Sequence, residues 1–345
     1  MTHSTLTLYD IHAWVVWLIS TTILILMARN PLYTILILFA VQIVAAVHGV
    51  VVNHAFRISL WRWGVLIVTL STLFNLISVH VGETVLFALP DSWPLVGGDI
   101  TAEAAVYGAS NGLLLVTLLA TFLAFNQIAP VHELIRLVPS SLRDLGIVIL
   151  IAITYVPETQ RHLQKIRQAQ AIRGHEVRGW RDWRPLILPL LIGGLERAMG
   201  LAEAMVARGY GATAERSQSL KAQLVLVMGL LAGLGGWVSA LWIGWPGWLL
   251  MGVGVLLVVG IVWWQSRQIA HTDYRQRPWR RIDSALLLMA LIPFLFIIVA
   301  GGFPAAYSPY PLWQWPPFDL WVGAAVSGIA LPAALPPPMH KRKPA

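Results

Sequence analysis

The sequence predicts an all-α integral membrane protein, in which a transmembrane helix bundle is joined to long amphipathic cytoplasmic helices. Of its 345 residues, 57% are hydrophobic and only 12% are charged, which is about half the charged fraction of a typical soluble domain. Apolar runs of about 20 residues, the length that spans a bilayer, recur along the chain. Basic residues gather beside these runs in the positive-inside pattern, so the net charge of +8 does not indicate nucleic-acid binding.

Seven apolar runs are long enough, or nearly so, to span a bilayer. They fall near 13–28, 32–52, 63–80, 106–128, 222–243, 247–265 and 284–302. Pro31 is predicted to open the second helix directly after a tight turn. An eighth run near 318–335 is weaker and is interrupted by Pro332, so an interfacial position is expected for it. No cleavable signal peptide is expected, because the first residues lack a basic stretch.

These apolar runs predict that the chain is organised into four regions. Residues 1–130 form an amino-terminal transmembrane bundle of four helices, and residues 131–221 form the long cytoplasmic helices. Residues 222–335 add about three more transmembrane helices, and residues 336–345 are a basic cytoplasmic tail.

The charges predict the orientation of the chain in the membrane. Residues 81–105 hold four acidic residues and no Lys or Arg, so this loop is placed outside. Residues 126–221 hold thirteen Lys or Arg and eight Asp or Glu, so this segment is placed in the cytoplasm. The amino terminus and the basic tail then lie in the cytoplasm as well. The localisation that follows is a multi-pass protein of the plasma membrane.

Three helices are predicted in the cytoplasmic segment, over about 140–156, 157–173 and 185–208. Pro157 is expected to separate the first two, and Gly174 and Gly209 to follow the ends of the second and third. The first half of the third helix is almost entirely apolar, which favours a helix lying flat at the membrane surface. Polar residues then recur along it at helical spacing and form an exposed surface of Glu196, Arg197 and Glu203.

The second and third of these helices end in two similar basic motifs, Ala171-Ile172-Arg173-Gly174 and Val206-Ala207-Arg208-Gly209. An Arg followed by Gly is a common way for a helix to end, because Arg suits the negative end of the helix dipole and Gly suits the left-handed cap. Capping alone explains less well why small residues precede both motifs. Small side chains make the end of a helix narrow, so that it can enter a groove where the guanidinium group meets a carboxylate or a carbonyl oxygen. Docking onto a partner is therefore favoured.

The sequence offers little for catalysis. The chain has no cysteine, which excludes disulfides, thiolate metal sites and Cys nucleophiles. No phosphate-binding loop and no His pair with zinc-ligand spacing occurs, so no cofactor and no metal site is expected, and any ATP hydrolysis belongs to another subunit. Isolated polar residues such as Asn75 and His48 are expected to make helix–helix hydrogen bonds. Two alternatives stay open: a membrane enzyme acting on lipid or prenyl substrates, for which Glu158, His162, His175 and Glu176 are the only suitable cluster, and a self-contained channel or carrier.

These residues resemble the transmembrane component of energy-coupling factor (ECF) transporters, the EcfT/CbiQ family. The resemblance covers about residues 20–215. It is carried by Arg29-Asn30-Pro31-Leu32, Asn75-Leu76-Ile77-Ser78-Val79-His80-Val81-Gly82-Glu83-Thr84, Thr154-Tyr155-Val156-Pro157-Glu158-Thr159, Arg173-Gly174-His175, Arg178-Gly179-Trp180, Leu195-Glu196-Arg197-Ala198 and Ala202-Glu203-Ala204-Met205-Val206-Ala207-Arg208-Gly209-Tyr210.

The resemblance implies a scaffold subunit, not an enzyme, whose long cytoplasmic coupling helices cross in an X. Each helix tip docks on one of two ABC-type ATPase subunits, and the scaffold transmits their motion to a small substrate-binding membrane subunit for uptake of a vitamin or a transition-metal ion. Ala207, Arg208 and Gly209 match the family's tip motif in full. At the first tip Arg173 and Gly174 match, whereas Ile172 stands where the family usually has Ala. Membrane lipid is the remaining expected partner. The apolar runs after Lys221 exceed the family's usual end.

Overall fold

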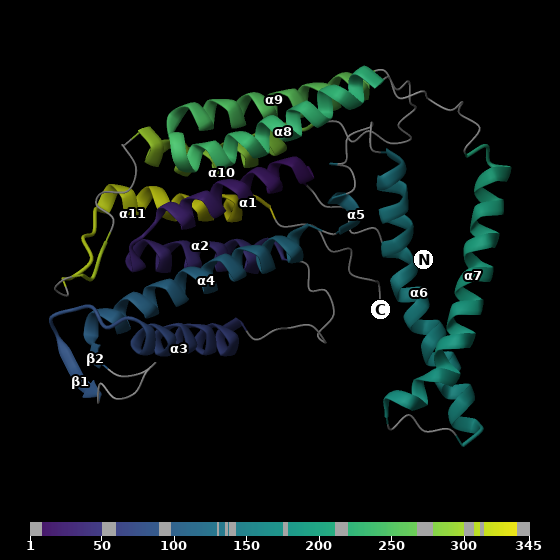
Figure 1. Cartoon of the computed structure of the whole chain (residues 1–345), viewed down its shortest axis with the longest axis horizontal. Helices are drawn as coiled ribbons and strands as arrows, with labels where there is room; N and C mark the ends of the chain where they lie inside the picture. Colours follow the sequence, from purple (N-terminus) through teal and green to yellow (C-terminus); the bar gives the residue numbers. More distant parts are fainter. Residues whose placement is uncertain are drawn as a thin grey trace. The chain divides into compact units, whose positions relative to one another are not determined.

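The computed structural model describes residues 9–49, 60–89, 98–129, 131–134, 137, 143–174, 179–210, 220–267, 279–299, 307–310 and 314–336. The chain divides into two compact units. The first combines residues 1–134 with residues 275–345, and the second is residues 135–274. Nearly all of the described residues are helical (Figure 1), as expected for an all-α membrane protein.

The first unit is a helix bundle. Its helices are α1 (Ile11–Met27), α2 (Pro31–His48), α3 (Leu60–Ser78), α4 (Ala102–Ile128), the short α5 (Val131–Leu134), α10 (Arg281–Val299) and α11 (Leu320–Ser327), which continues into the 3-10 helix η5 (Gly328–Ala334). α4 packs against α1, α2 and α3, whereas α10 packs against α1, and η5 packs against α2 and α10. The core side chains include Trp17, Tyr33 and Leu286, each fully buried.

Local sequence explains where the first two helices begin. Asp10 caps α1, because its carboxylate accepts the backbone N–H of His12 at 3.0 Å. Asn30 caps α2 in the same way through the N–H of Leu32, and Pro31 occupies the first turn, where a missing N–H costs nothing. The predicted opening of this helix at Pro31 is confirmed.

Two glycines bring α3 and α4 into backbone contact. Gly108 and Gly112 lie four residues apart on α4, and a Cβ at either would come within 2.7 Å of a Cα atom of α3. The hydroxyl of Ser71 on α3 also donates to the carbonyl of Gly108 at 2.8 Å. This small-residue spacing is typical of closely packed membrane helices. Asn75 donates to Ser71 O within its own helix at 3.0 Å, and among the described residues no hydrogen bond from it to another helix is found.

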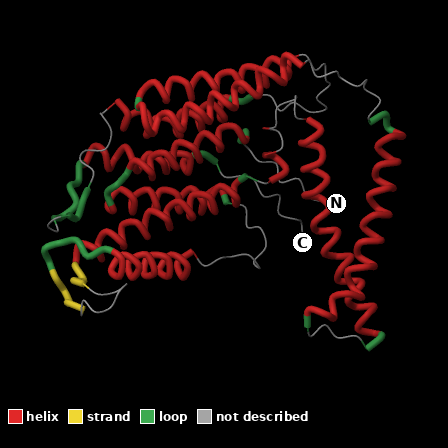
Figure 2. The backbone as a smooth tube through the Cα atoms, in the orientation of Figure 1, coloured by secondary structure: helices red, strands yellow, loops and turns green. Residues whose placement is uncertain are grey.

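A short antiparallel β-hairpin lies in the loop that was predicted to be outside. Strand β1 (Val85–Leu89) pairs with β2 (Gly98–Thr101), as Figure 2 shows. Glu103, in the first turn of α4 and fully buried, accepts the N–H of Thr84 at 3.2 Å. Thr101 caps α4 and donates to Val81 O at 3.0 Å. The hairpin is therefore attached to the start of α4, a feature that the sequence did not reveal.

The carboxy-terminal helices close the same bundle as the amino-terminal ones. Three amino-terminal side chains bond to the backbone of the last described residues. Trp17 Nε1 of α1 donates to Ile329 O at 3.2 Å, and His48 Nε2 of α2 donates to Pro332 O at 2.8 Å. Tyr9 Oη, just before α1, donates to Pro336 O at 2.6 Å. The hydrogen bond between segments that was predicted for His48 is confirmed. The weak run near 318–335 is thus packed against α2 and α10, and its interfacial position stays a prediction.

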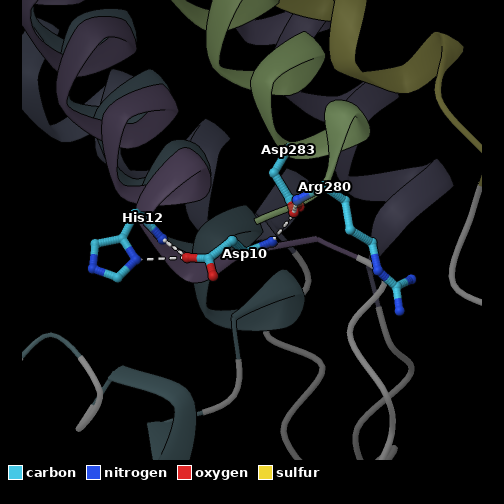
Figure 3. A network of polar contacts seen from close by, with 4 residues as sticks. All are labelled: Asp10, His12, Arg280 and Asp283. Atoms are coloured by element: carbon cyan, nitrogen blue, oxygen red, sulfur yellow. Dashed lines mark hydrogen bonds and ion pairs between the residues drawn. The ribbon is translucent and has the colours of Figure 1, made fainter. Parts of the chain in front are cut away.

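The carboxylate of Asp283 joins the start of α10 to the start of α1 (Figure 3). Asp283, fully buried in the first turn of α10, accepts the backbone N–H of Asp10 at 2.8 Å and that of Arg280 at 2.9 Å. Asp10 in turn holds the ring of His12, with Nδ1 at 2.6 Å from Oδ1. One side chain on α10 therefore satisfies backbone donors at the amino-terminal ends of two helices, where such donors have no partner inside the helix.

The second unit contains α6 (Arg143–Ile172), the 3-10 helix η4 (Trp180–Trp183), α7 (Arg184–Ala207), α8 (Leu220–Ile243) and α9 (Trp245–Arg267). The predicted break at Pro157 is wrong, because α6 continues through this proline. Proline costs a helix one backbone hydrogen bond and about 3 kcal/mol. Residues on both sides of Pro157 contact α7, as described below, and these contacts hold the helix together across it.

α8 and α9 form a tight antiparallel hairpin. A Cβ at Gly236 or Gly247 would lie within 2.2 Å of a backbone nitrogen of the partner helix, so only glycine permits this approach. The outward faces carry exposed apolar side chains, with Trp242 and Trp245 beside the turn and Trp263 and Trp264 toward the other end of α9. Aromatic residues at both ends are typical of helices that span a membrane.

Seven helices among the described residues are long and apolar enough to cross a membrane: α2, α3, α4, α7, α8, α9 and α10. α1 is a shorter apolar helix of 17 residues. α7 belongs to this set by length and composition, so its predicted position flat on the membrane surface stays a prediction. The predicted division at residues 130, 221 and 335 and the predicted cytoplasmic side also stay predictions.

Candidate docking site on two crossing helices

The two Arg-Gly motifs form similar helix ends, which are called the tips below. At the end of α7 the N–H of Gly209 donates to Val206 O at 2.9 Å and that of Tyr210 to Met205 O at 3.0 Å, which are the two bonds of a Schellman cap. At the end of α6 the N–H of Gly174 donates to Ala171 O at 2.9 Å. Both glycines have a left-handed φ, of 79° and 80°.

Both tips project freely from the described part of the unit. Arg173 and Arg208 are exposed, as are the small residues Ala171 and Ala207 that precede them. Ile172 is 88% exposed. Among the described residues no hydrogen bond or ion pair is recorded for either guanidinium group. A cation beside exposed apolar and small side chains at a narrow helix end is suited to a groove on another protein.

α6 and α7 cross each other in an antiparallel sense (Figure 1). Glu158 of α6 meets Arg197 of α7, with Oε1 at 3.8 Å from Nη1. One turn further along α6, His162 faces Gly193, one turn back along α7, and a Cβ at Gly193 would lie 2.8 Å from His162 Nε2. Because the contacts advance in opposite directions on the two helices, the carboxy-terminal tips lie on opposite sides of the crossing.

Arg197 is the central residue of this crossing. Its Nε donates to Gly193 O at 2.8 Å, one turn back on its own helix. Its guanidinium carbon lies 5.8 Å from the centre of the Tyr155 ring on α6, within the range of a cation–π contact. The side chain is only 29% exposed, whereas that of Glu158 is 52% exposed. The predicted surface is thus divided: Glu196 and Glu203 are exposed, but Arg197 is turned toward α6.

Sequence reasoning missed Tyr155 as a member of the site, whereas the small residues around Gly193 predict a surface that another helix can approach closely. Tyr155, Glu158 and His162 are spaced i, i+3 and i+7, and Gly193 and Arg197 are spaced i and i+4, so each set lies on one helix face. That spacing was the available signal. It was hidden because Pro157 was expected to end the helix between the first two residues.

The cluster considered for an enzyme is not assembled in the described residues. Glu158 and His162 face α7 at the crossing, and His175 and Glu176 lie outside the described residues. Within the part of the chain that the structure describes, no group of three or more His, Asp or Glu side chains is placed to hold a metal ion.

Comparison with known proteins identifies relatives of this part of the chain. The family model for CbiQ, described as a cobalt transport protein, matches residues 4–220. The energy-coupling factor transporter transmembrane protein EcfT of Leuconostoc gelidum subsp. gasicomitatum is 35% identical over 81 residues, which is 22% of this chain and 30% of that protein. The EcfT protein of Staphylococcus aureus is 36% identical over 89 residues, 24% of this chain and 33% of that protein. That of Brevibacillus brevis is 28% identical over 129 residues, 36% of this chain and 42% of that protein.

The aligned stretches thus span about a third of the length of these relatives. The family match ends at residue 220, where α8 begins. The pairs α6–α7 and α1–α2 lie inside the match, whereas α8, α9, α10, α11 and η5 lie beyond it.

Proposed function

Because the chain belongs to the CbiQ family of cobalt transport proteins, we propose that it is the coupling membrane subunit of an ECF-type importer. In this role it transmits motion driven by ATP hydrolysis in two ABC-type ATPase subunits to a small membrane subunit that binds the substrate. The substrate class is a vitamin or a transition-metal ion. The chain itself carries no hydrolytic step.

The observation that carries the proposal is the pair of matching tips on opposite sides of one crossing. Arg173 and Arg208 end helices of opposite direction, and the glycine after each has the same left-handed backbone and the same hydrogen bond to the carbonyl three residues back. Two equivalent tips pointing away from each other suit two separate docking grooves, one on each of two ATPase subunits. A rigid connection between the tips then allows the closing of the ATPases to act on both helices together.

The orientation in the membrane follows from the charges. The proposal places the amino terminus and the α6–α7 pair in the cytoplasm, where the ATPases are, and the β1–β2 hairpin outside. The excess of basic residues around α6 and α7 and the acidic residues around the hairpin support it. α7 then lies along the membrane surface with its apolar first half toward lipid.

The test is to identify what the full-length chain binds. The tagged protein is purified in mild detergent from its own cells, and the proteins that accompany it are identified by mass spectrometry. Two ABC-type ATPases, or two copies of one, together with a small hydrophobic membrane protein are expected. Purification of the chain without any ATPase, under conditions that retain other membrane complexes from the same cells, would overturn the proposal.

A further inference from the structure

We propose that Arg197 is a positioning residue that fixes the angle at which α6 and α7 cross, and with it the separation of the two Arg-Gly tips. The inference rests on the proposed function only for its consequence in transport. The crossing itself can be measured on the isolated chain.

The guanidinium group of Arg197 connects the two helices through three groups. Its Nε is anchored to Gly193 O on α7 at 2.8 Å. The remaining atoms reach across to the Tyr155 ring and to Glu158 Oε1 on α6. Because the guanidinium group is planar and its Nε is fixed, its plane holds the two α6 groups in one orientation relative to α7.

The burial of this side chain is costly, which indicates a positional role. Nη2 of Arg197 and the hydroxyl of Tyr155 are buried without a hydrogen-bond partner among the described residues. An arginine that served only for solubility would extend its nitrogens into water. Retaining a charged group at 29% exposure with an unpaired nitrogen is explained by the contacts that it makes between helices.

A second contact sets the distance between the helices but not their angle. At Gly193 a Cβ would lie 2.8 Å from His162 Nε2, so the imidazole ring packs directly against the backbone of α7 at this point. Arg197 lies one turn away, about 6 Å along the helix. The packing of His162 on Gly193 limits how near the helices lie. The contacts of Arg197 with Tyr155 and Glu158, one turn away, fix how the helices are rotated relative to each other.

The tips amplify any change at the crossing. Arg173 follows Glu158 by 15 residues and Arg208 follows Arg197 by 11 residues, which places the tips about 22 Å and about 16 Å from the crossing. A rotation of 10° moves the α6 tip by about 4 Å on this lever. Docking constellations tolerate about 0.5 Å, so the crossing angle decides whether both tips engage together.

Arg161 provides a matched control. It also contacts Glu158, with Nη1 at 3.8 Å from Oε2, but it lies on α6 itself and is 74% exposed. Replacing Arg161 removes a cation from the same carboxylate and leaves the connection between the helices in place.

The test uses spin labels and pulsed electron paramagnetic resonance on the full-length chain in lipid nanodiscs. The sequence has no cysteine, so Gln168→Cys and Ala202→Cys place one label near each tip without other changes. Both positions are exposed. With Arg197→Met we expect the distance distribution to shift and to broaden at least twofold. With Arg161→Met we expect it to match that of the labelled parent. Superimposable distributions for Arg197→Met and the parent would overturn the inference.

Two further measurements keep the result interpretable. If Arg197→Met does not fold, Glu158→Gln removes only the charged partner and is expected to give a smaller shift, and an unchanged distribution there would overturn the inference. In the complex, Arg197→Met is expected to retain its ATPases while transport per ATP hydrolysed falls at least fivefold. If the parent binds no ATPase, the proposed function fails, yet the distances still decide the role of Arg197.

Discussion

Gly174 and Gly209 hold their backbones in the same left-handed conformation, with φ of 79° and 80°. Apart from the adjoining residues of the chain, no atom in the described part of the structure lies within 4 Å of a Cβ built at either position. Glycine is therefore favoured at both helix ends for its backbone freedom and not for space, and the two ends share this backbone conformation although their side chains differ.

Replacing these glycines should weaken ATPase binding without steric conflict. An L-residue in the left-handed region costs about 1–2 kcal/mol, so Gly209→Ala is expected to lower the affinity for the ATPases about 5- to 30-fold. Gly209→Asn should lose less, because Asn adopts this conformation more readily. The measurement is the amount of ATPase retained on the immobilised chain. Gly194→Ala, at an interior position of α7 with equal space, is the control, and an equal loss there would exclude the cap as the cause.

Charge reversal at the tips should weaken ATPase binding and, with it, substrate uptake. Loss of a partly buried Arg contact costs roughly 2–5 kcal/mol in a complex, so Arg208→Glu is expected to reduce binding at least 30-fold and the double change with Arg173→Glu to abolish it. Both are measured by co-purification and by substrate uptake. Arg167→Glu, an exposed position within α6, should behave as the parent. Normal transport by the double variant would contradict docking through these tips.

Replacing the side-chain carboxylate with an amide should lower the stability of the protein more at Asp283 than at Asp319. The Asp283 carboxylate accepts two backbone N–H groups while fully buried, but an amide has one acceptor oxygen, so Asp283→Asn leaves one donor facing an NH2 group. A loss of about 1–3 kcal/mol in the free energy of unfolding is expected. Asp319 accepts one N–H, from Trp321, and Asn caps helices equally well, so Asp319→Asn should be neutral. Thermal unfolding in detergent compares them, and equal midpoints would count against this role of Asp283.

The contact between α3 and α4 should not tolerate a side chain at Gly112. A Cβ there would lie 2.7 Å from Val68 Cα, and because the neighbour is backbone, the helices must separate. Gly112→Val is expected to cost about 1–3 kcal/mol, seen as a lower unfolding midpoint in detergent. Gly260→Val is the control, since among the described residues no atom of another helix lies within 4 Å of a Cβ built at that position on α9. A similar midpoint for both variants would show that the close approach contributes nothing to stability.

The sequence predicted the helices well because hydropathy and end signals are local. The helix predicted over 185–208 is observed at Arg184–Ala207, and Gly174 and Gly209 follow the ends of α6 and α7 as predicted. Pro157 misled the prediction for a physical reason. Its local cost is outweighed by contacts of Tyr155 and Glu158 with a residue on another helix, and such contacts cannot be read from the residues around the proline.

The tertiary role of single polar residues was also beyond the sequence. Arg197 was assigned to an exposed surface because its neighbours Glu196 and Glu203 repeat at helical spacing, yet it lies one helix face away, against α6. Asp10 and Asp283 are separated by 273 positions, and nothing near either residue indicates the other. Helix periodicity predicts which residues share one face of a helix. It does not predict which other helix packs against that face.

The hydrogen bond between Asp10 and Asp283 also affects how the protein folds during synthesis, because its two partners are made far apart in time. Ribosomes add roughly 5–20 residues per second, so α1 emerges roughly 14–55 s before the side chain that completes its amino-terminal end. During this interval the buried faces of α1 and α2 lack α10 and η5, and the chain that separates them includes α6 and α7. We therefore expect the nascent bundle to depend on lipid or on a membrane chaperone until its last quarter is synthesised.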